Sequence, residues 1–157
     1  MARYAYDTLT RVDWVVTLSS TTSPTATQLN AGTNLSTFVT KDGVAPSLTP
    51  NMVDSATIAD LFDAQGVGSY GGTLTLKGYR DVTADTFWNL VVYGTVGFVV
   101  VRRGILYSTV YSAAQKCEVY PAQMHEPLPE NSASNTQTAF NCQFAITSTP
   151  VLKATVA

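Results

Sequence analysis

Charged side chains are scarce in this sequence. They make up 13% of its 157 residues, about half of the roughly 25% that soluble domains usually carry. Threonine, serine, asparagine and glutamine fill the polar positions instead. A monomer normally keeps a charged surface, which holds it apart from its neighbours. The low charge therefore predicts a surface that partner chains largely cover, with a weakly charged, secreted β domain as the alternative.

Basic residues are also few. The chain has nine Lys and Arg, a net charge of −2, and no cluster of positive charge. A protein that binds nucleic acid tightly usually carries a clustered basic face, because each phosphate contact depends on it. The sequence therefore excludes tight binding of DNA or RNA.

Only two cysteines are present, Cys117 and Cys142, and two do not make a disulfide framework. Cys142 lies in an alternating segment, residues 140–147, and falls on its apolar face together with Phe140 and Phe144. A buried thiol in such a place behaves as a small hydrophobic side chain. We expect free thiols and a reducing compartment.

Long hydrophobic runs are missing as well. The longest, residues 90–101, spans about 12 residues and is interrupted by glycines, which is too short to cross a bilayer. The first residues, MARYAYDTLTRVDW, contain no apolar core of the kind found in secretory signals. We expect neither a membrane partner nor a signal sequence.

No pattern of catalytic residues stands out. His125 is the single histidine, no G-x-S-x-G elbow accompanies it, and a solvated loop histidine is the favoured interpretation. Asp54, Asp60 and Asp63 are too few for a hard cation and are better explained by helix capping and solvation. Residues 66–71 match G-x-G-x-x-G, but the expected order of strand and helix is inverted, which indicates a turn. We expect no enzyme, no cofactor and no metal.

The most informative stretch is residues 70–104. Residues 73–79 alternate as a strand, with an apolar face and a polar face formed by Thr73, Thr75 and Lys77. Residues 84–93 predict a short helix after an N-cap at Thr83, and its apolar stripe should anchor it to a sheet. That stripe consists of Phe87, Leu90 and Val91.

Residues 95–101 are β-branched and apolar on both faces, as in a central strand. Arg102 and Arg103 end this strand and point to opposite faces. Either one of them pairs across a subunit boundary while the other meets solvent, or both are solvated strand ends. The alternation alone does not choose between these two interpretations.

The remaining segments complete a mainly β (α+β) fold. We expect further strands at residues 14–18, 35–40, 105–111, 115–120 and 138–147, a helical turn at 25–31 and a second helix at 54–65. Residues 41–50 contain two prolines and a glycine, which predicts a loop that opens a long excursion over residues 41–70. The sequence predicts one domain, residues 1–157, with an N-terminal extension (1–13) and a C-terminal tail (148–157). The expected architecture is a β-sandwich or barrel of about seven strands with one flanking helix.

The order of several segments resembles a known family. It shows in LNAGTNLS at residues 29–36, DLFDAQ at 60–65, LTL at 74–76, the Phe87-Trp88 helix, GFVVVRRG at 97–104, EVYP at 118–121 and the end of the chain. The chain resembles the major tail proteins, or tail tube proteins, of long non-contractile-tailed bacteriophages, particularly those that infect actinobacteria. The resemblance covers most of the chain, and its specificity lies in the ordered set of segments.

This resemblance implies a structural role without catalysis. Such proteins form hexameric rings that stack into a hollow tube, through which DNA passes as cargo during ejection. The implied partners are other copies of the chain, the tape measure protein, the tail terminator and the baseplate or distal tail proteins. The implied location is the virion tail, assembled in the cytoplasm of the host bacterium.

The resemblance also suggests roles for particular residues. An excursion like the one here commonly reaches a neighbouring subunit or ring, and part of the sheet lines the lumen. Thr73, Thr75 and Lys77 are the candidates for the lumen wall, and the lysine is unexpected in a wall that should not hold phosphates. The candidate inter-subunit contacts are Lys41, Asp42, Val44, Pro46, Leu48, Arg102 and Arg103.

Three other functions compete with a tube subunit. A tail terminator or head-tail connector would form single rings on a similar fold. A monomeric β-sandwich could bind a carbohydrate or a protein through exposed aromatic residues such as Tyr107 and Tyr111. A hydrolase would depend on His125.

Overall fold

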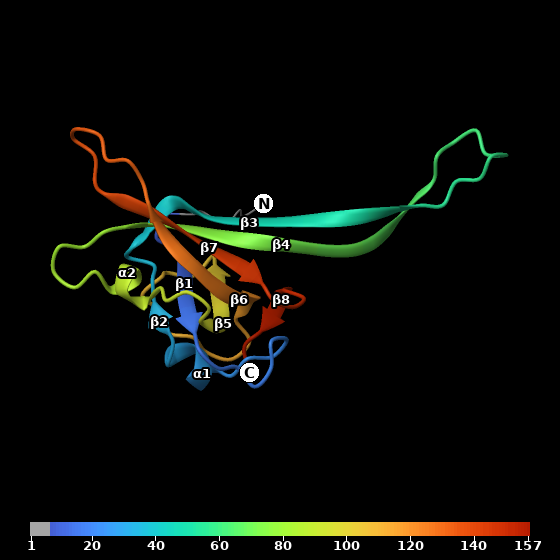
Figure 1. Cartoon of the computed structure of the whole chain (residues 1–157). Coiled ribbons are helices and arrows are strands. Elements are labelled where there is room, and N and C mark those ends of the chain that lie inside the picture. The colour runs from blue at the N-terminus through green and yellow to red at the C-terminus, as the bar shows by residue number, and fades with distance from the viewer. Residues whose placement is uncertain (1–6) are drawn as a thin grey trace.

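A single antiparallel sheet of eight strands curls around the core of the protein. The computed structural model describes residues 7–157, and Figure 1 shows the strands wrapping the body while one hairpin projects far beyond it. The order along the sheet is β2-β1-β5-β6-β7-β4-β3, and β8 pairs with β6. The strands are β1 (Thr10–Val15), β2 (Thr33–Asn34), β3 (Val39–Asp54), β4 (Gln65–Tyr79), β5 (Val96–Arg103), β6 (Lys116–Pro129), β7 (Ala139–Ile146) and β8 (Val151–Thr155). The mainly β class predicted from the sequence is confirmed.

Strand β5 occupies the centre of the body, as its apolar composition predicts. It pairs with β1 on one side and with β6 on the other. Val99 and Val101 face the main core, whereas Val100 faces a second, smaller core. Because both faces of the strand are covered, no polar position is tolerated until its last two residues.

The main core lies inside the curl of the sheet. Its aromatic members come from several strands, and Trp14 of β1 packs 5.8 Å from Phe144 of β7. Helix α2 (Thr86–Leu90) closes this core by inserting Phe87 beside Phe140, with ring centroids 4.9 Å apart. Gly78 of β4 lies directly beneath Phe87, where an added Cβ would come within 2.6 Å of the ring. The absence of a side chain at Gly78 is what lets the helix sit this close to the sheet.

The second core lies on the other face of β1, β5 and β6. Helix α1 (Ala26–Asn30) covers it through Leu29, and Thr25 caps that helix by accepting a hydrogen bond from the amide of Gln28. The expected helical turn at residues 25–31 is therefore present. Strand β8 adds Ala154 to this core, so half of the segment expected to be a tail is part of the sheet.

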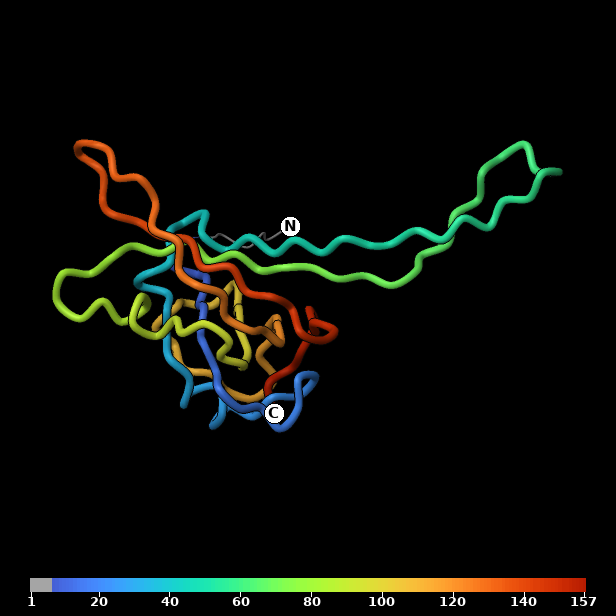
Figure 2. The backbone as a smooth tube through the Cα atoms, in the orientation of Figure 1, coloured from blue at the N-terminus to red at the C-terminus, as the bar shows by residue number. Residues whose placement is uncertain are grey.

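The largest departure from expectation is the excursion at residues 41–70. It is a hairpin of two long strands, β3 and β4, and not a loop. Figure 2 shows the hairpin extending well beyond the body. Pro46 and Pro50 had argued against a strand, but β3 is the last strand of the sheet, and prolines are tolerated at such an edge because their missing N–H can face solvent. We call residues 48–72, which include the loop that joins the two strands, the arm.

Other local predictions also differ from the structure. Residues 54–65 do not form a helix, because nothing packs against their apolar face. Residues 105–111 form turns and no strand, residues 35–38 form a turn before β3, and β6 runs on to Pro129. Strand β1 begins at Thr10, inside the N-terminal extension expected at residues 1–13. Residues 1–6 of that extension lie outside the described residues. Helix α2 is five residues long, because Asp85 before it has a left-handed backbone (φ 48°) and Val91 after it is extended.

Candidate assembly surfaces

The residues that could support catalysis are scattered over the body. His125 is exposed on β6, and its ring lies 5.6 Å from that of Tyr93 in an edge-on contact. Both cysteines are buried and unbridged. Within residues 7–157 no group of three potential metal-ligating side chains comes together. The described part of the chain also has no helix long and apolar enough to cross a membrane.

The arm is the most distinctive surface of the molecule. Strand β4 pairs with β7 only from Thr73 to Tyr79, whereas β3 and β4 continue to pair with each other out to Asp54 and Gln65. At about 3.4 Å per residue, the ribbon beyond Thr73 projects roughly 27 Å from the body. A two-stranded ribbon by itself is marginally stable in water. The outer part of the arm therefore has little support from its own subunit.

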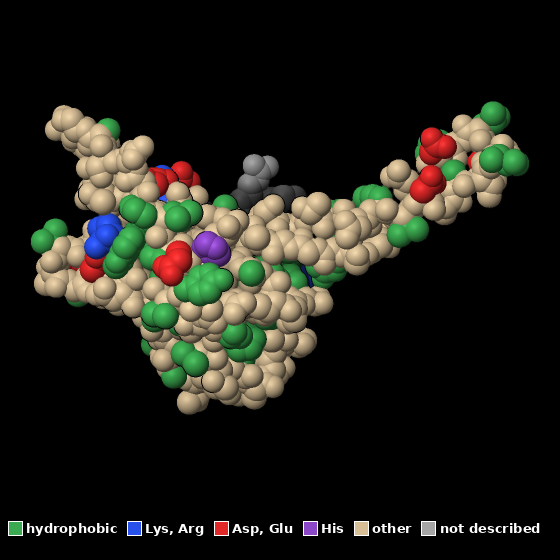
Figure 3. Space-filling model, viewed as in Figure 1, with side chains coloured by type: hydrophobic (Ala, Val, Ile, Leu, Met, Phe, Trp, Pro, Cys, Tyr) green, Lys and Arg blue, Asp and Glu red, His purple; other side chains and the backbone are tan. Residues whose placement is uncertain are grey.

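Apolar side chains are exposed along the arm and most of all at its tip. Met52, Val53 and Val67 are more than half exposed on the ribbon. At the tip, Ile58 and Leu61 are fully exposed and Phe62 is 80% exposed. Figure 3 shows these apolar groups interleaved with acidic ones at the far end of the hairpin. An exposed apolar patch rimmed by polar groups marks an interaction site.

Local hydrogen bonds, and not packing, order the tip. Asp60 accepts hydrogen bonds from the amide and the hydroxyl of Thr57, at 2.8 and 2.9 Å. These bonds from Thr57 lower the pKa of the Asp60 carboxyl. The amide of Ser55 donates to the carbonyl of Ala64 and closes the loop. Sequence periodicity had placed the tip's apolar residues on a buried helical face, which is wrong for the isolated chain.

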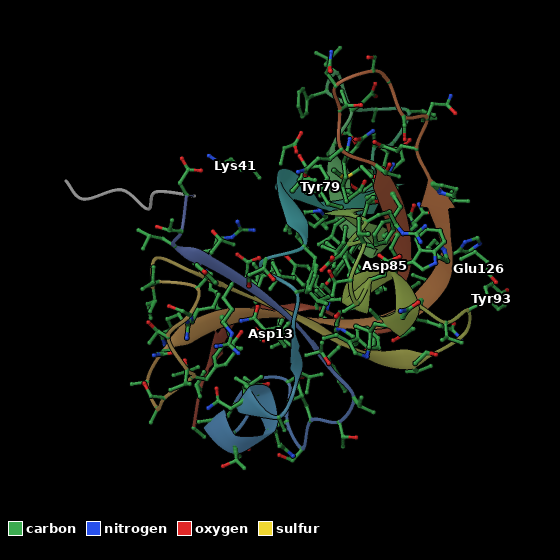
Figure 4. The ribbon with its side chains drawn as sticks, turned by 90° about the vertical axis from the view of Figure 1, so that its left-hand side faces the viewer. Asp13, Lys41, Tyr79, Asp85, Tyr93 and Glu126 are labelled. Carbon is green, nitrogen blue, oxygen red and sulfur yellow. The ribbon has the colours of Figure 1, made fainter. Side chains whose placement is uncertain are left out.

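The contacts expected at the start of β3 lie where the arm leaves the body. Lys41 is exposed and pairs with Asp7 at 3.1 Å. Val44 packs against the main core, Pro46 is exposed and Leu48 is half-buried. Figure 4 shows Lys41 at the periphery of the body and Asp13 in its middle.

The three candidates for the lumen wall share the polar outer face of the sheet. Thr75 lies opposite Gln143 of β7, and Lys77 lies opposite Asn141. Lys77 also pairs with Glu130 at 2.8 Å, and this bond raises the pKa of the lysine. The pairing neutralises the one basic group that had seemed out of place on this face.

Arg102 requires a correction. Its side chain is fully buried within the subunit and cannot reach a neighbouring chain. Its guanidinium donates to the carbonyls of Leu106 and Thr109, at 2.9 and 2.8 Å. The arginine thus holds the irregular segment 105–111 against the sheet, which the alternation of strand residues could not reveal because the partners are backbone carbonyls of a loop.

A buried polar network surrounds this arginine. Asp13 accepts hydrogen bonds from both Nε and Nη2 of Arg11, at 2.8 and 2.9 Å, and from the hydroxyl of Tyr111 at 2.8 Å. The guanidinium carbons of Arg11 and Arg102 each lie 4.8 Å from the centre of the Tyr111 ring. Sequence analysis missed this network, because its members are 98 residues apart. Tyr111 is buried here, so it cannot serve the exposed aromatic binding surface considered as an alternative.

Arg103 lies at the surface end of β5. Its Nε donates to Glu118 of β6 at 2.9 Å, and the hydroxyl of Tyr120 donates to the same carboxylate. Its side chain is about one-third exposed. Phe87 and Val91, expected to anchor the helix, are buried in the main core, and Leu90 packs against that core.

Comparison with known proteins shows which family the chain belongs to. A family model described as phage tail tube protein matches residues 1–157. The chain belongs to this family. Tail tube proteins are structural components of the virion and are not enzymes, in agreement with the scattered catalytic residue types.

A solved structure supports the same fold. A chain in the cryo-EM structure of the anti-feeding prophage baseplate, symmetrised six-fold, superposes with a TM-score of 0.57 over 98% of this chain and 98% of that one. The two sequences are 8% identical, so the likeness concerns the fold alone. A search of curated proteins finds no match. Membership of the tail tube family makes the chain a structural tail protein.

Proposed function

We propose that this chain forms hexameric rings that stack into the tail tube of a long non-contractile-tailed phage of the type that infects actinobacteria. The tube would be a passive conduit for DNA during ejection. Membership of the tail tube family supports the tube, and the six-fold symmetry named for the similar baseplate structure makes six the natural ring number. The actinobacterial type rests on the segments quoted from the sequence.

The observation that carries this proposal is the arm. It extends a thin ribbon with exposed apolar side chains away from a body that is otherwise well packed. A monomer gains nothing from such an element, because the exposed backbone edges of a ribbon invite association. In a stacked tube each arm would be covered by a neighbouring subunit, and the low surface charge fits such coverage.

The polar outer face of the sheet is the proposed lumen wall. Thr73 and Thr75 are uncharged, and Lys77 is paired with Glu130. A wall without unpaired positive charge does not retain phosphates by releasing their counterions. DNA would therefore slide past this face without binding to it.

Negative-stain electron microscopy of the purified protein tests the proposal. At high concentration we expect tubes of uniform width with six-fold end views. Single rings that do not stack would favour a tail terminator or connector instead. Dispersed monomers at high concentration would contradict the proposal.

The remaining partners follow from the tube. We propose that the tape measure protein occupies the lumen during assembly, that the tail terminator and the baseplate or distal tail proteins close the two ends, and that assembly takes place in the host cytoplasm. Co-purification of tubes with these proteins from infected cells tests this part. Tubes of defined length with closed ends that form without these proteins would contradict it.

A further inference from the structure

The acceptor for the arm can be identified from charge as well as from shape. Resting on the proposed assembly of copies, we propose that the tip of the arm, residues 54–64, docks on the β6–β8 edge of another copy. At that edge Lys116 and Lys153 would receive the acidic groups of the tip, and Leu152 would meet its apolar side chains.

The arm is uniformly acidic. Between Lys41 and Lys77 the sequence contains no lysine or arginine, while Asp54, Asp60 and Asp63 all lie at the tip end of the hairpin. These carboxylates surround the exposed Ile58, Leu61 and Phe62. A complementary surface must therefore combine positive charge with an apolar contact.

Nearly all the cations of the body are already neutralised or buried. Within residues 7–157, Arg102 is buried and five other cations form ion pairs. The five pairs are Arg11 with Asp13, Lys41 with Asp7, Lys77 with Glu130, Arg80 with Asp85, and Arg103 with Glu118. Lys116 and Lys153 are the two described cations that remain exposed without a carboxylate partner. Within the described part of the chain, the acidic tip therefore has one region of complementary charge.

The two lysines lie close together on neighbouring strands. Lys116 opens β6 opposite Thr155 of β8, and its ammonium donates to the Thr155 hydroxyl at 2.5 Å. Lys153 is two residues from Thr155. The pairing of β8 with β6 is irregular between Cys117 and Val119, and a bulge of this kind turns successive residues outward. As a result Leu152 and Lys153 are both exposed, and Leu152 is 49% exposed.

A subunit cannot make this contact with itself. The arm is a continuous ladder that projects beyond the body, and Figure 1 shows the free length of this ribbon between its tip and β8, which lies on the side of the body facing the arm. Folding the tip back would break the β3–β4 ladder. The contact therefore joins two copies and gives the arm a direction, from the tip of one subunit to the β6–β8 edge of the next.

A charge swap tests this contact in the full chain. Asp63→Lys and Lys153→Asp each place like charges together, and we expect each to raise the protein concentration needed for tube formation roughly two- to ten-fold. The double variant restores an opposite-charge pair and should return that concentration to near the wild-type value. Lys153→Arg keeps the charge and is the matched control. The two side chains are exposed and form no hydrogen bond with the described residues, so the variants should fold normally.

The outcomes separate this contact from the proposed function. If the wild-type protein forms tubes and both single reversals form them equally well, or if the double variant fails to recover, the acceptor is wrong while the tube stands. If the wild-type protein forms no tubes, the proposed function itself fails. A loss of assembly in Lys153→Arg would also count against a contact made by charge.

Discussion

Asp13 is the most consequential single residue of the body. It is fully buried and accepts hydrogen bonds from Arg11 and Tyr111. With Arg102 beside them, the network holds two guanidinium groups and one carboxylate in a site almost without solvent. Removing the carboxylate would leave two buried positive charges without compensation.

We therefore expect Asp13→Ala to lower the free energy of unfolding by about 3–5 kcal/mol, the usual cost of breaking a buried ion pair by losing one partner. Chemical denaturation of the variant and the wild-type protein measures the difference. Asp7→Ala is the control, because Asp7 pairs with Lys41 at the exposed surface and should change stability little. A loss for Asp13→Ala no larger than that of the control would show that the network does not support the fold.

The two thiols give a second test at this scale. Burial raises the pKa of Cys117 to about 11 and that of Cys142 to about 12. Since the thiolate is the reactive form, both should resist alkylation at pH 8 in the native protein and react once it is unfolded. Mass spectrometry after treatment with iodoacetamide measures this. Rapid labelling of either cysteine in the folded protein would contradict its buried position.

The arm is the element on which the proposed assembly depends. Its outer half contacts no other element of its own subunit, so it contributes little to the stability of the body. Pro50 pairs with Tyr70 across the ribbon, and this pair marks a natural place to shorten it.

Replacing residues 51–69 with an Asn-Gly turn, which suits a two-residue hairpin connection, should leave the melting temperature of the body nearly unchanged and abolish tubes. Thermal denaturation and electron microscopy measure the two effects. Insertion of the same Asn-Gly pair into the exposed loop at residues 131–137 is the control for a local change of chain length. Tubes that still form from the shortened chain would remove the arm from the assembly contact.

At the scale of the whole molecule, the curl of the sheet separates its surfaces. The inner face holds the main core, the outer face of β4 and β7 is polar, and the arm leaves from one edge. If the outer face lines the lumen, changes there should alter the charge of the channel and leave the contacts between subunits unchanged.

Exchanging the charges of Lys77 and Glu130 tests this arrangement. The double variant Lys77→Glu with Glu130→Lys keeps the ion pair and should form tubes like the wild-type protein. Lys77→Glu alone places two carboxylates together on the wall, yet it should also leave assembly intact. Electron microscopy of both variants checks this, and loss of tubes in the double variant would place Lys77 at a subunit interface.

Several features could be predicted from particular residues. The alternation of Leu74 and Leu76 with Thr73 and Thr75 correctly separates a buried face from a polar one. The apolar residues before Arg102 correctly mark β5 as a central strand. Phe87 could be recognised as buried because its spacing follows a helical face.

Other features could not be predicted, because they depend on partners far away in the chain. Pro46 and Pro50 indicated a loop until the sheet order showed that β3 is an edge strand. The spacing of Ile58, Leu61 and Phe62 indicated a covered face, but not that the cover is missing in the isolated subunit.

Alone, the sequence determined which faces must be buried, that the chain is mainly β, and which family it resembles. Those properties are local, since alternation, propensity and ordered segments are carried by neighbouring residues. Only the tertiary structure decided that residues 41–70 form a projecting hairpin, that Arg102 is internal and that Lys116 and Lys153 have no carboxylate partner among the described residues. The physical reason is that strand pairing and charge pairing join distant parts of a chain. A local sequence pattern can therefore show that a residue needs a partner without showing which residue that partner is.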